Sequence, residues 1–419
     1  MRLLLLLFLF GIYGLQLSSQ CSSISMVSET STFHLFNSIN DNLVAWYGKD
    51  ASGILQIYKN DGSGQVLVSD GTTTNNIGAY IQGNTIFWTG RDASGVEHTY
   101  QNDGTGQVLF SKGDNVRISG SMTVWRSQDN SGVYQIYKND GNGDELVSDG
   151  SSTAAAFMQV SGNTIVWQGR DAMGASQIYK NAGNGEELVS VGTSTGASFP
   201  QIDGSTIVWQ GRDDGTGTFQ IYKNIGNGEE LVSDGNSINN TAPKIDGNNI
   251  VWQATPSNFI GISQIYKNEG CGQELVSDGN TILNQSPIIQ GETIIWSAND
   301  ASATSQIYIN EGDGQELLSI GTSTTNFSPA ISGNTIIWTG EDATGRHIYK
   351  TECTLKAPPD PSINFNNEVV TGEHRASNLI TLTNVVVSTT ATLYSPNIDV
   401  NSITVNNAAE LLISANDCL

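Results

Sequence analysis

Residues 199–233 read FPQIDGSTIVWQGRDDGTGTFQIYKNIGNGEELVS, and this pattern indicates the architecture of the chain. Short runs rich in β-branched and aromatic residues (FPQI, TIVWQG, TFQIYKN, EELVS) alternate with the turn-forming segments DGS, RDDGTG and IGNG. Such runs, separated by Gly, Asp and Asn, predict four short antiparallel strands joined by turns. Because no stretch of useful length shows helical periodicity, helical repeats are disfavoured.

The same unit recurs along most of the chain. An Ile or Val stands seven residues before each Trp, and a Tyr follows 11 to 14 residues after it. Units of about 42 residues with four strands each are typical of propeller blades. We expect these aromatic side chains in the cores between blades rather than in a binding stripe. The eight Trp residues that share this register are Trp46, Trp88, Trp125, Trp167, Trp209, Trp252, Trp296 and Trp338.

The number of strands predicts eight blades, with seven as the alternative. There are eight first, eight Trp-containing and eight Tyr-containing strands, but only seven internal strands of the ELVS type. The segment Ile24–Ser28 matches that type and precedes the first unit. We therefore predict that it pairs beside Arg346–Lys350 in the last blade and closes the ring, which would otherwise expose two sheet edges.

The cysteines support this closure. Cys21 and Cys353 map to the same hairpin position of a blade, one before the N-terminal strand and one after the last Tyr strand. We therefore predict a Cys21–Cys353 disulfide in place of the missing covalent turn. Cys271 and Cys418 are either free or paired with each other.

The ends of the chain differ from the repeat. Residues 1–20 have a basic start, an apolar run and a polar exit, which predicts a signal peptide and a secreted or cell-surface protein. The propeller is predicted over residues 21–353 and a Pro-rich linker over 354–361. Residues 362–419 alternate Val, Ile and Leu with Thr, Asn and Ser, which predicts a small stacked β module.

The charge excludes some partners. With 18 Lys and Arg against 41 Asp and Glu, the formal net charge is −23. A chain this acidic is not attracted to nucleic acid or to an anionic membrane. No transmembrane segment is expected in the mature chain, because no later run is apolar for 18 residues. Nothing in the sequence fixes an oligomeric state.

The blade pattern resembles the TolB-like propeller group. The segments that carry the resemblance are SFPQIDG, TAPKIDG and FSPAISG, followed by TIVW or TIIW, QIYKN and ELVS. The group includes interaction platforms, glycan-handling enzymes and peptidase domains, so the resemblance implies the fold and no single function. The tail, through ATLYS, NIDVNSITV and AELLISA, resembles the coathanger-stack modules of secreted Bacteroidota proteins.

Two sets of residues are candidates for ligand contact. The residue eight positions before each Trp varies between units that are otherwise alike, and it lies on the innermost predicted strand, near the central channel. This position supplies a polar arc of Tyr80, Arg117, Gln159, Gln201 and Lys244. Four residues after seven of the Trp residues stands an Asp. Of two alternatives for it, capping of its own turn is favoured over a rim that contacts ligand or calcium. The rim residues are Asp50, Asp92, Asp129, Asp171, Asp213, Asp300 and Asp342.

Catalysis has little support in the sequence. The chain has four His, and no single unit carries its own acid, base or nucleophile. We predict no catalytic residues, no metal site and no cofactor, with calcium at the Asp rim as the alternative. The favoured function is a secreted binding or adhesion protein that presents a propeller face to a glycan or protein ligand. A glycan-active hydrolase or lyase is the alternative.

Overall fold

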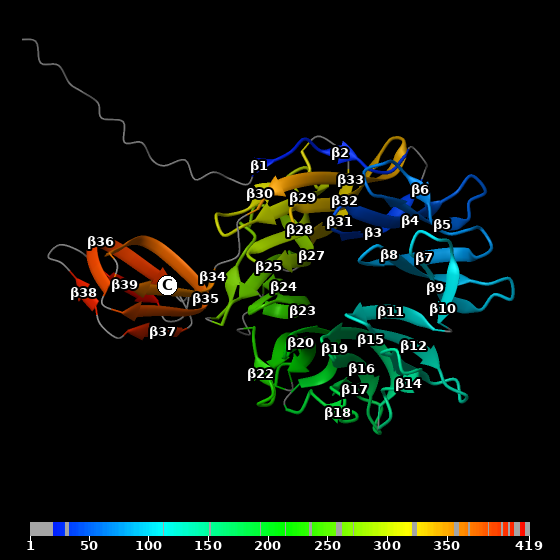
Figure 1. Cartoon of the computed structure of the whole chain (residues 1–419), viewed down its shortest axis with the longest axis horizontal. Helices are drawn as coiled ribbons and strands as arrows, with labels where there is room; N and C mark the ends of the chain where they lie inside the picture. Colours follow the sequence, from blue (N-terminus) through cyan, green and yellow to red (C-terminus); the bar gives the residue numbers. More distant parts are fainter. Residues whose placement is uncertain are drawn as a thin grey trace, which may run out of the picture.

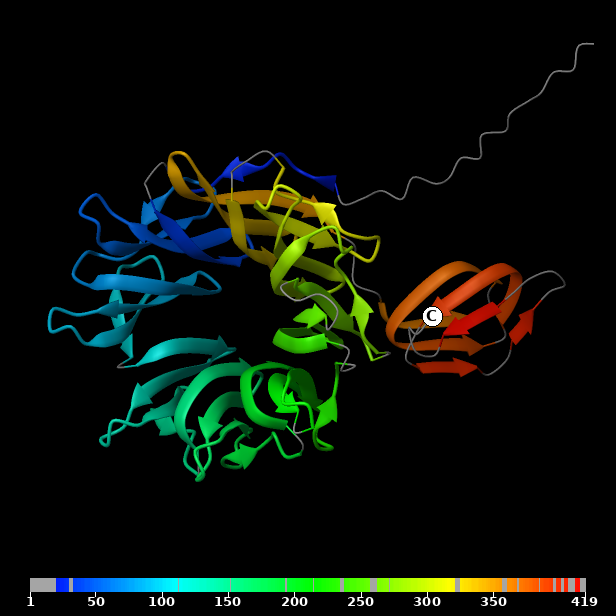
Figure 2. The same ribbon diagram turned by 180° about the vertical axis from the view of Figure 1, so that it is seen from behind.

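The structure, a computed structural model, is all-β in its described residues, and its strands form a ring of eight small sheets (Figures 1 and 2). The described residues are 20–29, 33–111, 113–150, 152–192, 194–213, 215–233, 237–256, 262–270, 272–320, 325–355, 360–367, 369–383, 385–394, 397–400, 403–405 and 411–414. Residues 1–19 of the predicted signal peptide, Cys271 and Cys418 lie outside them.

Each sheet is one blade, numbered 1 to 8 in chain order, and eight sheets exclude the seven-bladed alternative. The first strands are β3 (His34–Asn40), β7 (Thr74–Gln82), β11 (Asp114–Ser119), β15 (Thr153–Ser161), β19 (Ser194–Asp203), β23 (Ser237–Asp246), β27 (Ile282–Gln290) and β31 (Thr325–Ser332). The second strands are β4 (Leu43–Lys49), β8 (Thr85–Arg91), β12 (Met122–Gln128), β16 (Thr164–Arg170), β20 (Thr206–Asp213), β24 (Asn249–Pro256), β28 (Thr293–Asn299) and β32 (Thr335–Asp342).

Third and outer strands complete the blades. The third strands are β5 (Leu55–Asn60), β9 (Glu97–Asn102), β13 (Tyr134–Asn139), β17 (Ser176–Asn181), β21 (Phe219–Asn224), β25 (Gln264–Asn268), β29 (Ser305–Asn310) and β33 (Gly345–Thr354). The outer strands of blades 1 to 7 are β6 (Val66–Leu67), β10 (Val108–Ser111), β14 (Glu145–Leu146), β18 (Glu187–Leu188), β22 (Glu230–Leu231), β26 (Glu274–Leu275) and β30 (Glu316–Leu317). Most outer strands have only two residues, so they are shorter than the ELVS runs suggest.

The N-terminal segment closes the ring as predicted. β2 (Ser25–Met26) pairs antiparallel with β33, Ser25 opposite Lys350 and Met26 opposite Tyr349. β1 (Gln20–Cys21) pairs with the end of the same strand, and Cys21 forms a disulfide with Cys353. Both predictions of the closure are therefore confirmed.

Packing between blades completes the ring. Buried side chains of adjacent blades form shared cores at all eight junctions, including the junction of blade 8 with blade 1. Each core contains a Trp from a second strand, stacked at 6.1–6.3 Å on the Tyr opposite it in the third strand. The Trp and Tyr residues therefore hold the blades together, as expected.

Buried polar side chains satisfy the Trp indoles. Trp88 donates from Nε1 to Asn76 Oδ1 at 3.0 Å, and Asn also accepts this bond in blades 6, 7 and 8. In blade 1 the acceptor is Nδ1 of fully buried His34, at 2.8 Å. Since Nδ1 accepts, Nε2 carries the proton and donates to the Glu29 carbonyl at 3.3 Å.

His34 should make the protein sensitive to acid. Burial lowers its pKa from 6.5 to about 4, so between these values the unfolded chain binds a proton that the folded chain does not. Its contribution to stability is therefore complete above pH 6.5 and is lost as the pH falls toward 4. At pH 5 this effect should lower the free energy of unfolding by about 2 kcal/mol. His34→Asn, which places at this position the Asn that blade 2 has there, should remove the loss. Urea unfolding of both proteins at pH 5 and pH 8 measures it, and an identical pH dependence would contradict this role.

The C-terminal residues form a separate set of parallel strands. They are β34 (Asp360–Asn366), β35 (Val369–Thr383), β36 (Val385–Tyr394), β37 (Asn397–Val400), β38 (Ile403–Val405) and β39 (Leu411–Ser414). Ile380 lies opposite Ile363 and Ile398, 17 and 18 residues away, so successive rungs stack on one another over a core of their own. β34 begins within the segment 354–361 that the sequence suggests as linker.

Candidate functional site

The first strands surround the axis of the ring (Figure 1). The five residues of the predicted arc lie on the first strands of blades 2 to 6, each opposite an apolar residue of the second strand. Because their backbones are fixed by this pairing, the side chains occupy equivalent positions in successive blades. All five side chains are partly buried.

The structure brings the arc together in two groups. Arg117 lies over the Tyr80 ring, 5.7 Å from its centroid, and its Nε donates to Gln159 Oε1 at 3.4 Å. Its Nη1 donates to the Val116 carbonyl at 2.9 Å. In the second group, Lys244 Nζ donates to Gln201 Oε1 at 3.4 Å. The structure therefore places the five predicted residues on the first strands of adjacent blades, and it adds the contacts between them.

Burial weakens the ionised forms of these groups. It lowers the pKa of the Arg117 guanidinium, and it lowers the pKa of Lys244, which the positive charge of Arg117 lowers further. Burial raises the pKa of the Tyr80 hydroxyl. Arg117 and Lys244 repel each other and are partly removed from water, so their charged forms have a higher free energy than they would have in water. A bound anion would offset this cost.

Two phenylalanines to which the sequence assigned no function lie two residues before Gln159 and Gln201 on the same strands. Phe157 and Phe199 lie on the first strands of blades 4 and 5, their ring centroids are 4.5 Å apart, and they remain 49% and 43% exposed. Solvent thus reaches the inner strands at these rings. Together with the five arc residues they form what we call the inner surface.

Both rings stand on a backbone bulge. The pairing of first and second strands shifts register around these residues, and their φ angles of 51° and 54° lie in the left-handed region. Blades 2, 3, 6, 7 and 8 have the same conformation ten residues before Trp, at Gly78, Asn115, Ala242, Ser286 and Ser328. Small residues fit this conformation better than Phe. The bulge can therefore form without an aromatic residue, so it does not explain why Phe stands here. The variation at this position between blades is the sequence signal that could have singled out Phe157 and Phe199.

The predicted rim residues cap the loops between second and third strands. Asp92 Oδ1 accepts hydrogen bonds from the backbone of Ser94 and Val96, and its Oδ2 contacts His98 Nε2 at 3.0 Å. Hydrogen bonds from Ser94 lower the pKa of Asp92 to about 2. The other rim residues bond backbone amides in the same way. This use of the carboxylates matches the turn-capping alternative.

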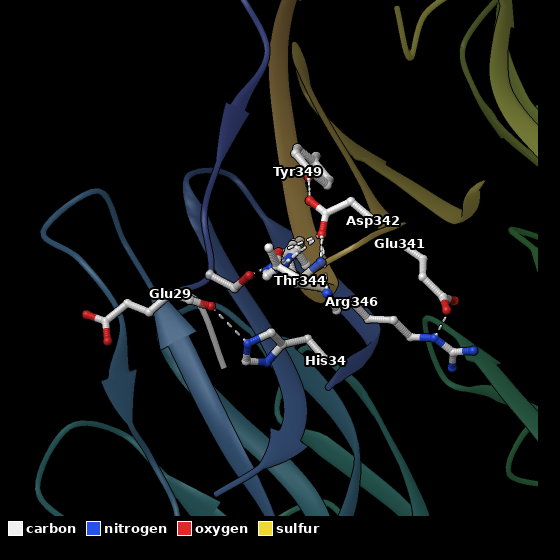
Figure 3. A network of polar contacts seen from close by, with 11 residues as sticks. Glu29, His34, Glu341, Asp342, Thr344, Arg346 and Tyr349 are labelled. Carbon is white, nitrogen blue, oxygen red and sulfur yellow. Dashed lines mark hydrogen bonds and ion pairs between the residues drawn. The ribbon is translucent and has the colours of Figure 1, made fainter. Parts of the chain in front are cut away.

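A polar network lies where blade 8 meets blade 1 (Figure 3). His347 Nε2 is 2.9 Å from Thr344 Oγ1, and Arg346 Nε donates to Glu341 Oε2 at 2.8 Å. His347 and His98 stand where other blades have Gln, and each contacts the Asp of its own loop. These contacts hold the loops in place.

A groove of about 370 Å³ lies between blades 3 and 4, on the side of the ring opposite to the Asp-capped loops. Its walls are hairpin turns and include Met122, Lys138, Asp140 and Asn181. Lys138 is paired with Glu145 at 3.2 Å. Among the described residues, no three His, Cys, Asp or Glu side chains lie close enough together to hold a metal ion.

Comparison with known proteins supports the fold. No family model matches the chain, and no curated protein matches it. Among solved structures it is similar to the computationally designed Ika8 protein, with a TM-score of 0.53 and 16% identity over 78% of this chain and 98% of that one. It is also similar to the propeller domain of the Trilobed protease from Pyrococcus furiosus, with a TM-score of 0.50 and 13% identity over 68% and 97%. At these identities the likeness shows the fold alone, a β-propeller.

Proposed function

We propose that this chain is a secreted or cell-surface protein that binds a glycan or protein ligand at the inner surface of its propeller and does not transform it. The observation that supports this most is the inner surface itself, where two exposed rings share their strands with the two amides, on the blades between those that carry the cations. Binding sites typically combine apolar and aromatic contact area with a few polar groups that fix orientation.

The absence of acid–base machinery at these residues favours binding over catalysis. A glycosidase requires two carboxyl groups at a defined separation, whereas the inner surface consists of Tyr, Arg, Gln, Lys and Phe side chains. The rim carboxylates are engaged in their own turns.

The disulfide supports export, because such bonds persist in oxidising compartments. No helix in the part of the chain that the structure describes is long and apolar enough to span a bilayer.

A glycan array with purified protein, run with and without calcium, tests the proposal. Binding to a ligand found there should weaken at least tenfold in Tyr80→Ala plus Arg117→Ala, because the variant removes one cation and the ring beneath it. A matched control is Tyr134→Ala plus Lys180→Ala on the third strands, which should leave the affinity unchanged. Unchanged affinity in a folded inner-surface variant would contradict the site, and release of new reducing ends from the bound glycan would contradict a non-catalytic role.

A further inference from the structure

The two cations of the inner surface differ from most others in the described part of the chain. Arg126, Lys138, Lys180, Lys223 and Lys267 each form an ion pair with a carboxylate. The described contacts of Arg117 and Lys244 are instead with neutral groups: the amides of two Gln, one carbonyl and one phenol ring.

This arrangement is unexpected for a protein with more than twice as many acidic as basic residues. Partly buried cations are normally paired, because desolvation without a partner raises their free energy. Burial instead lowers the pKa of Lys244, and the positive charge of Arg117 lowers it further. An anion supplied from outside would remove that cost, and a guanidinium suits a carboxylate because it presents two parallel N–H donors.

The two phenyl rings lie between the cations along the ring of blades. The Arg117–Gln159 hydrogen bond links blades 3 and 4, the Phe157–Phe199 contact links blades 4 and 5, and the Gln201–Lys244 hydrogen bond links blades 5 and 6. In order along four blades, the inner surface therefore carries a cation, an amide, an aromatic pair, an amide and a cation.

This series is complementary to a saccharide. The negative face of an aromatic ring attracts polarised hydrogens such as those on the face of a sugar. The amide oxygens of Gln159 and Gln201 accept from the two cations, and each has a second lone pair for a hydroxyl group. Each amide nitrogen has two N–H donors, of which Gln201 uses one on the Pro200 carbonyl. The cations then require an anionic group on the same ligand.

We propose that Arg117 and Lys244 each bind a carboxylate of an oligosaccharide that contains uronic acid, with a sugar ring packed on Phe157 and Phe199. This inference rests on the proposed binding function and names its ligand class. The rest of the protein is acidic, so its charge repels a polyanion from a distance, but at physiological salt this repulsion is screened beyond about 8 Å. The contacts made at the inner surface therefore decide the affinity.

Titration calorimetry at physiological salt tests this inference with trisaccharides of glucuronate, galacturonate and mannuronate, each beside its carboxyl-reduced neutral form. Wild-type protein should bind at least one acidic trisaccharide ten or more times more tightly than its reduced form. Arg117→Gln plus Lys244→Gln should abolish that preference and leave binding of the reduced form within about threefold.

Phe157→Ala plus Phe199→Ala should weaken both forms at least tenfold. This variant should fold, because Ala242 occupies the same bulge position in blade 6, where it precedes a proline as Phe199 does. Lys180→Gln plus Lys223→Gln removes the same charge from the third strands and should change neither affinity. Thermal unfolding of all variants verifies that they are folded.

The outcomes separate the two proposals. A preference for the acidic form that survives in folded Arg117→Gln plus Lys244→Gln would overturn the carboxylate site, as would wild-type preference for the neutral form. If wild-type protein ignores every saccharide but binds a hexaglutamate peptide through Arg117, the saccharide is wrong while binding at the inner surface stands. If substitution of Tyr80, Arg117 or the two Phe changes the affinity for neither the trisaccharides, nor the peptide, nor any array ligand, the proposed function fails as well.

Discussion

Trp167→Ala should lower the free energy of unfolding by roughly 3–5 kcal/mol. Trp167 is fully buried, stacks on Tyr179 at 6.1 Å and belongs to the core that joins blades 2, 3 and 4. Its removal leaves a cavity that strands fixed by hydrogen bonds on both sides cannot fill. The indole Nε1–H bond to Ser152 Oγ, 3.2 Å long, is lost as well.

Chemical unfolding followed by fluorescence and by circular dichroism measures this change. The matched control is Met173→Ala in the same blade, whose side chain is 90% exposed and should change stability by less than about 0.5 kcal/mol. A loss for Trp167→Ala as small as that of the control would show that the Trp cores do not hold the blades together.

The second large effect concerns the closure. Cys353→Ser should destabilise the protein by roughly 2–4 kcal/mol, because the Cys21–Cys353 bond joins residues 332 positions apart and restricts the unfolded chain. The N-terminal strand should stay in place in the variant, since Val27 N still donates to the Ile348 carbonyl and Ile348 N to Ser28 Oγ.

Wild-type protein in reductant provides the control for this experiment. It should lose the same stability as the variant, while the variant itself should not respond to reductant. Equal stability of wild-type protein with and without reductant would contradict the contribution of the disulfide. Peptide mapping without reduction should find residues 21 and 353 in one cross-linked species.

The ring could be predicted because its determinants are periodic in the chain. Each Trp pairs with a Tyr of the next strand. The interval between Trp residues therefore gives the length of one blade unit, and the number of Trp residues gives the number of blades. Ser28 could be assigned because it repeats the role of Ser69, whose Oγ accepts from Ile57 N at 3.0 Å. The disulfide followed from the same register.

The candidate site could be predicted only in part. The position that varies between units, eight residues before each Trp, predicted Arg117 and Lys244 for the inner strands. The contacts between blades depend on side-chain direction, which the strand pattern alone does not give. Phe199 reads as an ordinary apolar residue at the start of FPQI, whereas a left-handed bulge turns it out of the core. A bulge inserts one residue into a strand, so the residues after it point to the opposite face of the sheet from the one that strict alternation predicts. A pattern of period two therefore assigns these residues to the wrong face.

Ligand binding at the inner surface is the proposal on which the others depend. A crystal structure of the protein with the tightest ligand from the array and the trisaccharide titrations shows where the ligand lies. Ligand density should contact the Arg117 guanidinium and the rings of Phe157 and Phe199. Density confined to the Asp loops or to the groove between blades 3 and 4, with the inner strands free of ligand, would contradict it.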